Sequence, residues 1–201
     1  MGTRGSDIGA LSAAAAFVGF ALLAREVLGR GPMILDRRAR ALAADDDLDG
    51  VRCALRPLFP IGLPGGFIPI AYLTAHWVKR HGRHGGPAIV TAAWSGWLAH
   101  RGAKLACRRE RPRRRGGPRR TDSFPSGHTT GITTLAIVTA HVLGREGLVS
   151  PAAERLIRYG APALMGAYRV IADDHWATDV VGGWLLGGAV SRAITEWSDG
   201  L

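Results

Sequence analysis

The stretch Leu58–Val78, LFPIGLPGGFIPIAYLTAHWV, decides the fold class, because no formally charged residue interrupts it. A helix needs about 20 consecutive apolar residues to cross the hydrocarbon core of a bilayer. The stretch therefore predicts a membrane-spanning helix and favours a membrane protein over a soluble one.

Five further apolar segments alternate with charged, arginine-rich segments. They are Ile8–Ala24, Gly86–Ala103, Thr129–Gly144, Tyr159–Ala172 and Ala177–Ile194. Several are shorter than a full span, but the alternation predicts an all-α protein: a six-transmembrane-helix bundle, with residues 1–201 forming one integral-membrane domain. The glycines of Val180–Gly188 suit close helix packing in lipid. Two alternatives stay open. One is a soluble protein with buried helices, and the other is a cleaved signal peptide at Ile8–Ala24.

The charge balance is strongly basic, with 26 Lys and Arg against 16 Asp and Glu and a net charge of +10. This balance indicates an anionic partner: nucleic acid, anionic lipid or a phosphorylated ligand. Arg113–Arg115 with Arg119 and Arg120 suit a diphosphate, a lipid headgroup or the membrane surface. They lack the interleaved aromatic residues that stack on bases, so no nucleic-acid partner is expected. Cys53 and Cys107 form neither a metal motif nor a disulfide framework.

The segment Ile34–Arg56 mixes apolar residues with arginine and aspartate. It reads either as an interfacial amphipathic helix or as a solvated loop with helical pieces. Within it, Asp45–Asp47 suits a solvated turn or a helix start. A metal site there is the alternative, but no histidine or second carboxylate cluster lies nearby in the sequence at ligand spacing.

Three cations stand at the edges of apolar segments, where charge is costly unless it faces a polar interior. They are Lys104, Arg111 and Arg169. Guanidinium groups match phosphate oxygens at two points, and an ammonium adds a point charge. If the three side chains converge, they form a phosphate-binding site.

The sequence Ser123–His128, SFPSGH, directly precedes the fourth apolar segment. Ser123 is a plausible N-cap, and Pro125 suits a first helical turn. The backbone N–H groups of that turn would then point at an anion, and Gly127 lets the backbone approach it closely.

His175 and Asp179 are four residues apart and would share one face of a helix. The carboxylate can then fix the tautomer of the imidazole and leave its other nitrogen free as a nucleophile. His128 can protonate the leaving oxygen. This set of residues predicts phosphate chemistry without a metal or cofactor. A lone histidine near a helix end is more often structural, so the prediction depends on all three clusters together.

The chain resembles the type 2 phosphatidic acid phosphatase superfamily, whose signature is Lys-x6-Arg-Pro, Pro-Ser-Gly-His and Ser-Arg-x5-His-x3-Asp. The matching residues are Lys104, Arg111 and Pro112, then Pro125, Ser126, Gly127 and His128, and finally Arg169, His175 and Asp179. Tyr168 stands where the family usually has serine. The resemblance covers residues 104–179 and the six-helix pattern, with the site expected at the membrane interface.

The resemblance implies a metal-independent phosphatase that acts on a lipid or polyprenyl phosphate or diphosphate. His175 would be the nucleophile that forms a phosphohistidine, His128 the acid and Asp179 the orienting partner. The residues expected to hold the phosphate are Lys104, Arg111, Ser126, Gly127 and Arg169. The alternatives are a vanadate-dependent haloperoxidase and a non-catalytic membrane scaffold.

The expected partners are the lipid-phosphate substrate and membrane lipids, and no obligate protein partner is evident. High Ala, Gly and Arg content suggests a bacterial protein of the plasma membrane. Lys and Arg are more numerous in the segments that carry the motifs than in those at the other end. The positive-inside rule therefore favours an active site that faces the cytoplasm.

Overall fold

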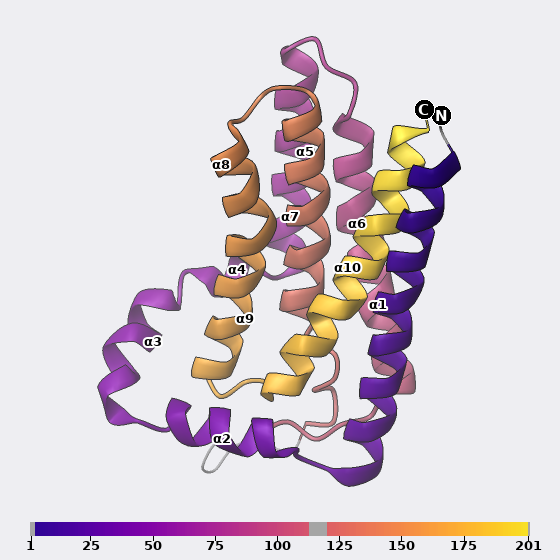
Figure 1. Cartoon of the computed structure of the whole chain (residues 1–201). Coiled ribbons are helices and arrows are strands. Elements are labelled where there is room, and N and C mark those ends of the chain that lie inside the picture. The colour runs from indigo at the N-terminus through magenta and orange to yellow at the C-terminus, as the bar shows by residue number, and fades with distance from the viewer. Residues whose placement is uncertain (1–2, 113–119, 201) are drawn as a thin grey trace.

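The computed structural model of the chain describes residues 3–112 and 120–200. Long helical runs lie side by side as a bundle, and the two ends of the chain lie next to each other at one end of it (Figure 1). In the described residues the backbone forms helices and turns with a single isolated bridge between Arg109 and Asp122, which confirms the all-α prediction. The basic run at Arg113–Arg115 and Arg119 lies outside these residues.

Each predicted apolar segment forms a helix or a helical run. The long elements are α1 (Thr3–Arg30), α5 (Pro64–Arg80), α6 (Gly86–Ala106), α7 (Gly127–Arg145), α9 (Ala161–Ile171) and α10 (Ala177–Asp199). The fifth is longer than predicted, since α8 (Pro151–Arg155) and the π-helical turn η2 (Leu156–Gly160) lead directly into α9. The helix α7 packs against α5, α6, α9 and α10.

The sequence predicted one continuous helix over Leu58–Val78, and this prediction is wrong. The short helix α4 (Leu58–Ile61) ends at Gly62, and α5 begins afresh at Pro64. Proline lacks an N–H and suits the first turn of a helix, so Pro64 starts α5 rather than continuing α4. A side chain at position 62 would also collide with the ring of His128, because its Cβ would lie 2.2 Å from a ring carbon.

The segment 34–56 contains the helices α2 (Ile34–Ala43) and α3 (Asp49–Leu55), joined by the 3-10 turn η1 (Asp46–Leu48). The helix α2 lies across one end of the bundle (Figure 1). A helix of a soluble protein usually buries its apolar side chains and exposes its charged ones. In α2, Ile34, Leu35 and Leu42 are exposed, whereas Asp36 is buried. Exposed apolar side chains on a basic helix are typical of a helix at a membrane interface.

Asp45 and Asp47 are exposed, in agreement with the solvated turn that the sequence favoured. The Asp47 N–H donates to Asp45 Oδ1 at 3.1 Å. Among the described residues, no group of three His, Cys, Asp or Glu side chains is arranged to hold a metal ion.

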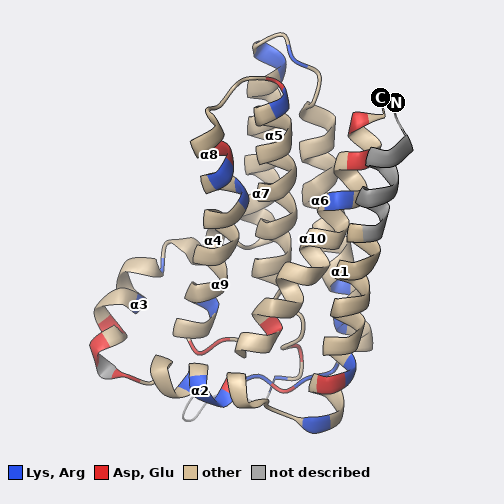
Figure 2. Ribbon diagram, in the orientation of Figure 1, with Lys and Arg blue, Asp and Glu red and all other residues tan. Residues whose placement is uncertain are grey.

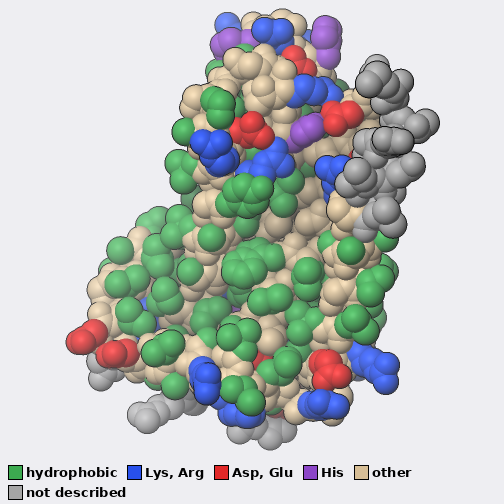
Figure 3. All heavy atoms as spheres, in the orientation of Figure 1, with side chains coloured by type: hydrophobic (Ala, Val, Ile, Leu, Met, Phe, Trp, Pro, Cys, Tyr) green, Lys and Arg blue, Asp and Glu red, His purple; other side chains and the backbone are tan. Residues whose placement is uncertain are grey.

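The surface of the bundle is apolar in its middle and charged at its ends. Figure 2 shows Lys, Arg, Asp and Glu concentrated toward the ends of the helices, and hydrophobic side chains cover the middle of the face in Figure 3. This distribution is typical of a helix bundle embedded in a bilayer. By length and composition, Ser12–Arg30 of α1 is the single candidate span in the described part of the chain. The six-span count therefore stays a prediction.

Candidate active site

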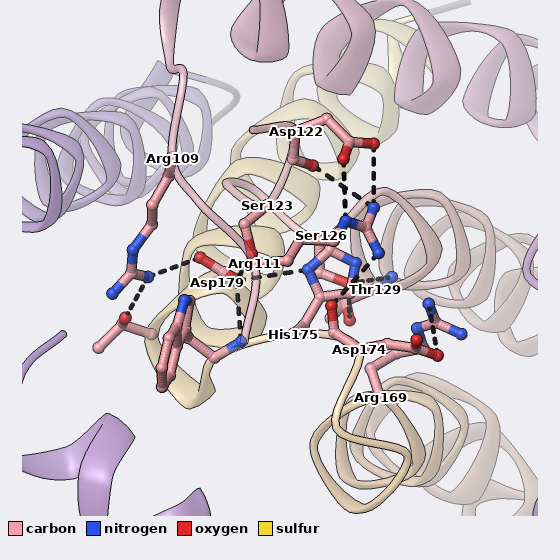
Figure 4. Close-up of polar contacts among 12 residues, drawn as sticks. Arg109, Arg111, Asp122, Ser123, Ser126, Thr129, Arg169, Asp174, His175 and Asp179 are labelled. Atoms are coloured by element: carbon pink, nitrogen blue, oxygen red, sulfur yellow. Dashed lines mark hydrogen bonds and ion pairs between the residues drawn. The ribbon is translucent and has the colours of Figure 1, made fainter. Parts of the chain in front are cut away.

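The three sequence clusters meet at the end of the bundle where α2 lies (Figures 1 and 4). Lys104 comes from the last turn of α6 and Arg111 from the segment after it, while Gly127 and His128 begin α7. With His175 they line a cavity of about 150 Å³. The remaining lining residues are Gly62, Leu63, Pro64, His100, Arg101 and Asp122. Chain segments far apart in sequence therefore build one polar site.

His175 and Asp179 are paired, but not through a shared helix face. Trp176 is the N-cap of α10, so His175 precedes the helix. Asp179, in the third helical position, accepts the Trp176 N–H at Oδ2 (2.9 Å), and the same oxygen lies 3.3 Å from His175 Nδ1. The carboxylate thus caps its own helix and reaches back to the imidazole. Both side chains are buried.

Burial lowers the pKa of His175 to about 4, and the charges of Arg111 and Arg169 act in the same direction. The hydrogen bond and charge of Asp179 oppose this change but do not cancel it. The imidazole is therefore neutral near pH 7. An ionised carboxylate only accepts hydrogen bonds, so the proton is assigned to Nδ1, and Nε2 keeps its lone pair.

Arg111 and Lys104 share an acidic partner that the sequence analysis missed. Arg111 Nε donates to Asp122 Oδ1 at 2.9 Å, and Lys104 Nζ lies 3.9 Å from Asp122 Oδ2. Burial raises the pKa of Asp122, but the hydrogen bonds and charge of Arg111 and the charges of Lys104 and Arg120 hold it well below its usual range. The carboxylate is therefore ionised at the mouth of the cationic site. Its position directly before Ser123, the first residue of the SFPSGH segment, was the one available signal.

The helix that follows SFPSGH begins three residues later than predicted. Ser126, not Ser123, is the N-cap of α7, and its hydroxyl accepts hydrogen bonds from the Thr129 hydroxyl (2.9 Å) and N–H. Ser123 instead donates its hydroxyl to Asp179 Oδ2. Gly127 and His128 are then the first two helical residues, whose N–H groups have no acceptor within a helix. The Ser126 side chain is fully buried and does not line the cavity.

Arg169 is buried and is not among the residues that line the cavity. Its guanidinium forms an ion pair with Asp174 (3.2 Å) and lies over the rings of Phe59 and Tyr168, 5.4 Å and 5.5 Å from their centroids. Tyr168, the departure from the family pattern, therefore packs against the cation that follows it.

His128 lines the cavity beneath α4. Its Nε2 lies 3.1 Å from the carbonyl oxygen of Phe59, and the two rings are 5.1 Å apart at their centroids. Phe59 and Gly62 were assigned to a membrane span by the sequence analysis. The prolines on either side of Gly62 were the signal that could have separated α4 from α5.

The buried His175–Asp179 pair lies beside the cations Lys104 and Arg111 at one end of an all-helical bundle, an arrangement suited to binding a phosphate-like anion. The family model described as PAP2 superfamily matches residues 67–200, and the chain belongs to this superfamily. The resemblance seen in the sequence motifs is thereby confirmed.

A solved structure shares the fold. It is the crystal structure of the first transmembrane PAP2 type phosphatidylglycerolphosphate phosphatase from Bacillus subtilis, with a TM-score of 0.80 and 18% sequence identity. The similarity covers 94% of this chain and 97% of that one. A search of curated proteins found no match.

Proposed function

We propose that the protein is a membrane-embedded phosphatase that removes phosphate from a lipid phosphate through a phosphohistidine on His175. The observation that carries this proposal is the pairing of His175 with Asp179 at a cavity lined by Lys104, Arg111 and His128. A neutral imidazole whose orientation is set by a carboxylate is a competent nucleophile. The converging cations supply the charge that a transferring phosphoryl group requires.

The proposed reaction has two steps. His175 Nε2 attacks phosphorus, a P–N bond forms, and the P–O bond to the lipid breaks while His128 gives a proton to the leaving oxygen. Water then attacks phosphorus with His128 as base, the P–N bond breaks, and inorganic phosphate leaves. Lys104 and Arg111 hold the phosphoryl oxygens, with the first N–H groups of α7 beside them. Because His128 Nε2 contacts the carbonyl oxygen of Phe59, proton transfer by this nitrogen requires that contact to break.

The lipid part of the proposal is supported by the surface of the bundle. Large apolar side chains are exposed along α1, α5 and α6, among them Phe17, Leu22, Leu73 and Leu98. The cavity opens at the end of these helices, where the phosphate of a bilayer lipid would lie. The similar fold of a phosphatidylglycerolphosphate phosphatase also favours this substrate class. Phosphatidic acid, phosphatidylglycerol phosphate and polyprenyl phosphates or diphosphates are the candidates.

Phosphate release from this panel, measured on purified protein in detergent, tests the proposal. His175→Ala should abolish release on every ester that the native protein cleaves, and an alkaline denaturing quench should trap phosphate on His175. His141→Ala is the matched control, because His141 forms a histidine–aspartate pair with Asp199 (2.7 Å) at the opposite end of α7 and α10. Turnover by His175→Ala near the native rate would disprove the mechanism. No release from any ester would favour a non-catalytic scaffold.

A further inference from the structure

A buried ion network lies on the side of Asp179 that faces away from His175. Arg109 Nη1 donates to Asp179 Oδ1 at 2.6 Å and to the Thr178 hydroxyl at 2.7 Å (Figure 4). The Arg109 side chain is 5% exposed and the Asp179 side chain 0% exposed. Arg109 does not line the cavity. Its guanidinium is therefore linked to His175 through the carboxylate of Asp179.

The network continues to α2. Arg109 Nη2 donates to Asp36 Oδ2 at 2.6 Å, and the N–H of Thr178 donates to Asp36 Oδ1 at 2.8 Å. The Asp36 side chain is fully buried. The two carboxylates thus share one guanidinium, and the planar fork of arginine serves both at once. Lysine, a point charge on a flexible stem, cannot hold both in the same way.

The two carboxylate oxygens of Asp179 have different hydrogen-bond partners. Arg109 takes Oδ1, whereas Oδ2 accepts hydrogen bonds from the Ser123 hydroxyl and the Trp176 N–H and faces His175. A carboxylate held at both oxygens cannot rotate, so its orientation toward His175 Nδ1 is set before substrate binds. A buried carboxylate without a cation would also be costly.

We infer that Arg109 is a positioning residue: it holds Asp179 in the orientation and charge state that keep the proton of His175 on Nδ1. This inference rests on the proposed role of His175 as nucleophile and extends it to a residue that the superfamily signature leaves unassigned. Asp36 acts one step further out, by holding the guanidinium in place from α2.

The charged and titratable groups around His175 decide the sign of the expected effect. They are Asp179 from α10, Arg169 from α9, Arg111 from the segment after α6 and His128 from α7. Removing Arg109 leaves Arg169, Arg111 and His128 unchanged. It removes the positive charge that pairs with Asp179. The more basic carboxylate then stabilises protonated His175, so the pKa of His175 should rise. A protonated imidazole is no nucleophile, so this rise lowers activity in the acid range. Near pH 7 His175 stays neutral, and the expected loss of activity there comes from the less well fixed orientation of Asp179 and His175.

The titration of His175 can be followed without turnover, by ¹⁵N NMR of histidine-labelled protein in detergent, with His175→Gln to assign the signal. In Arg109→Gln the His175 titration should move upward by about one pH unit. In Arg109→Lys, which keeps the charge, it should move less. Arg108→Gln is the matched control, since Arg108 is the exposed neighbour of the buried Arg109. In this variant His175 should titrate as it does in the native protein.

Kinetics supply the second measurement. In Arg109→Gln, kcat should fall on the order of 10- to 100-fold, by analogy with the loss seen when the hydrogen-bonded partner of a metal-ligating histidine is removed. KM should stay within about twofold, because Arg109 does not contact the cavity, and Arg109→Lys should recover part of kcat. A native His175 titration and native kcat in Arg109→Gln would overturn the inference.

Two further outcomes are decisive. If Arg109→Gln does not fold, Arg109→Lys carries the test, and a native titration and native kcat in that variant would also overturn the inference. If the native protein releases no phosphate but the His175 titration moves in Arg109→Gln, the positioning role stands and the proposed reaction fails. The two proposals are therefore distinguishable.

Discussion

The guanidinium of Arg111 grips the carboxylate of Asp122 at two points, with Nε 2.9 Å from Oδ1 and Nη2 3.1 Å from Oδ2. Lys104 also donates to the backbone carbonyl of Asp122. Two of the cations expected to bind phosphate therefore have an anionic partner within the protein. A phosphate that enters the cavity has to share them with this carboxylate.

Asp122→Asn should strengthen binding of the phosphate ester. The amide keeps the shape of the side chain and removes a charge that repels the substrate. Because the Asp122 side chain is 43% exposed, we expect KM to fall about two- to fivefold, the range set by partly exposed ion pairs. Asp173→Asn is the control, since Asp173 pairs with Arg40 and does not line the cavity. A higher KM in Asp122→Asn would show that Asp122 serves mainly to orient Arg111.

The pH dependence of kcat/KM should show a nucleophile that stays neutral far into the acid range. The pKa of His175 lies at about 4 because of burial, so protonation removes the nucleophile only as the pH falls toward that value. The acid limb attributable to His175 should therefore lie well below pH 6.5, the ordinary value for histidine. An acid limb of kcat/KM near pH 6.5 that is also present in the His141→Ala control would contradict this prediction.

The same burial makes folding stability depend on pH. The unfolded chain takes up a proton on His175 near pH 6.5, whereas the folded chain does so only near pH 4. The unfolded state binds more protons between these values, so the contribution of His175 to stability is complete above about pH 6.5 and falls as the pH drops. His175→Gln should flatten this part of the Tm profile measured in detergent.

Chelation and vanadate separate the proposed chemistry from metal-dependent hydrolysis. Excess EDTA should leave phosphate release unchanged, because the proposed steps use only side chains of the chain. Vanadate should inhibit as a trigonal-bipyramidal mimic of the transferring phosphoryl group. Activity lost on chelation and restored by a divalent ion would show that the site has been misassigned. Halide oxidation that requires vanadate and peroxide would support the haloperoxidase alternative.

The side of the membrane that the site faces can be read from a native thiol. Cys53 is exposed on α3, and α3 is tied to the site end of the bundle by Arg52, whose Nε donates to the carbonyl of Ile171 at 3.1 Å. If the site faces the cytoplasm, Cys53 should resist a membrane-impermeant thiol reagent in intact cells and react after lysis. Cys107 is buried and is replaced by serine in these measurements.

A cysteine at the other end provides the control. His84 lies in the exposed turn between α5 and α6, and His84→Cys in a background without Cys53 should label from outside. The reverse pattern would place the active site on the outer face and favour a substrate on that leaflet.

The sequence by itself determined the parts of the protein that depend on local pattern. Runs of apolar residues between arginine-rich segments predicted six helical stretches, and all six are helical. The spacing of Lys104, Arg111, His128, His175 and Asp179 identified the superfamily, because a motif records which residue types the chemistry needs. These inferences required no knowledge of which helix packs beside which.

The tertiary structure decided how those residues are held. Asp36 and Arg109 meet although 73 positions separate them, and neither belongs to a motif or a periodic pattern. The pairing of His175 with Asp179 depends on where α10 begins, and the ring contact of His128 with Phe59 depends on where α4 lies relative to α7. Each of these is a contact between side chains brought together by packing. A buried charge is stable only with its partner in place, and that partner is chosen by the arrangement of the helices, which the order of residues along one segment does not specify.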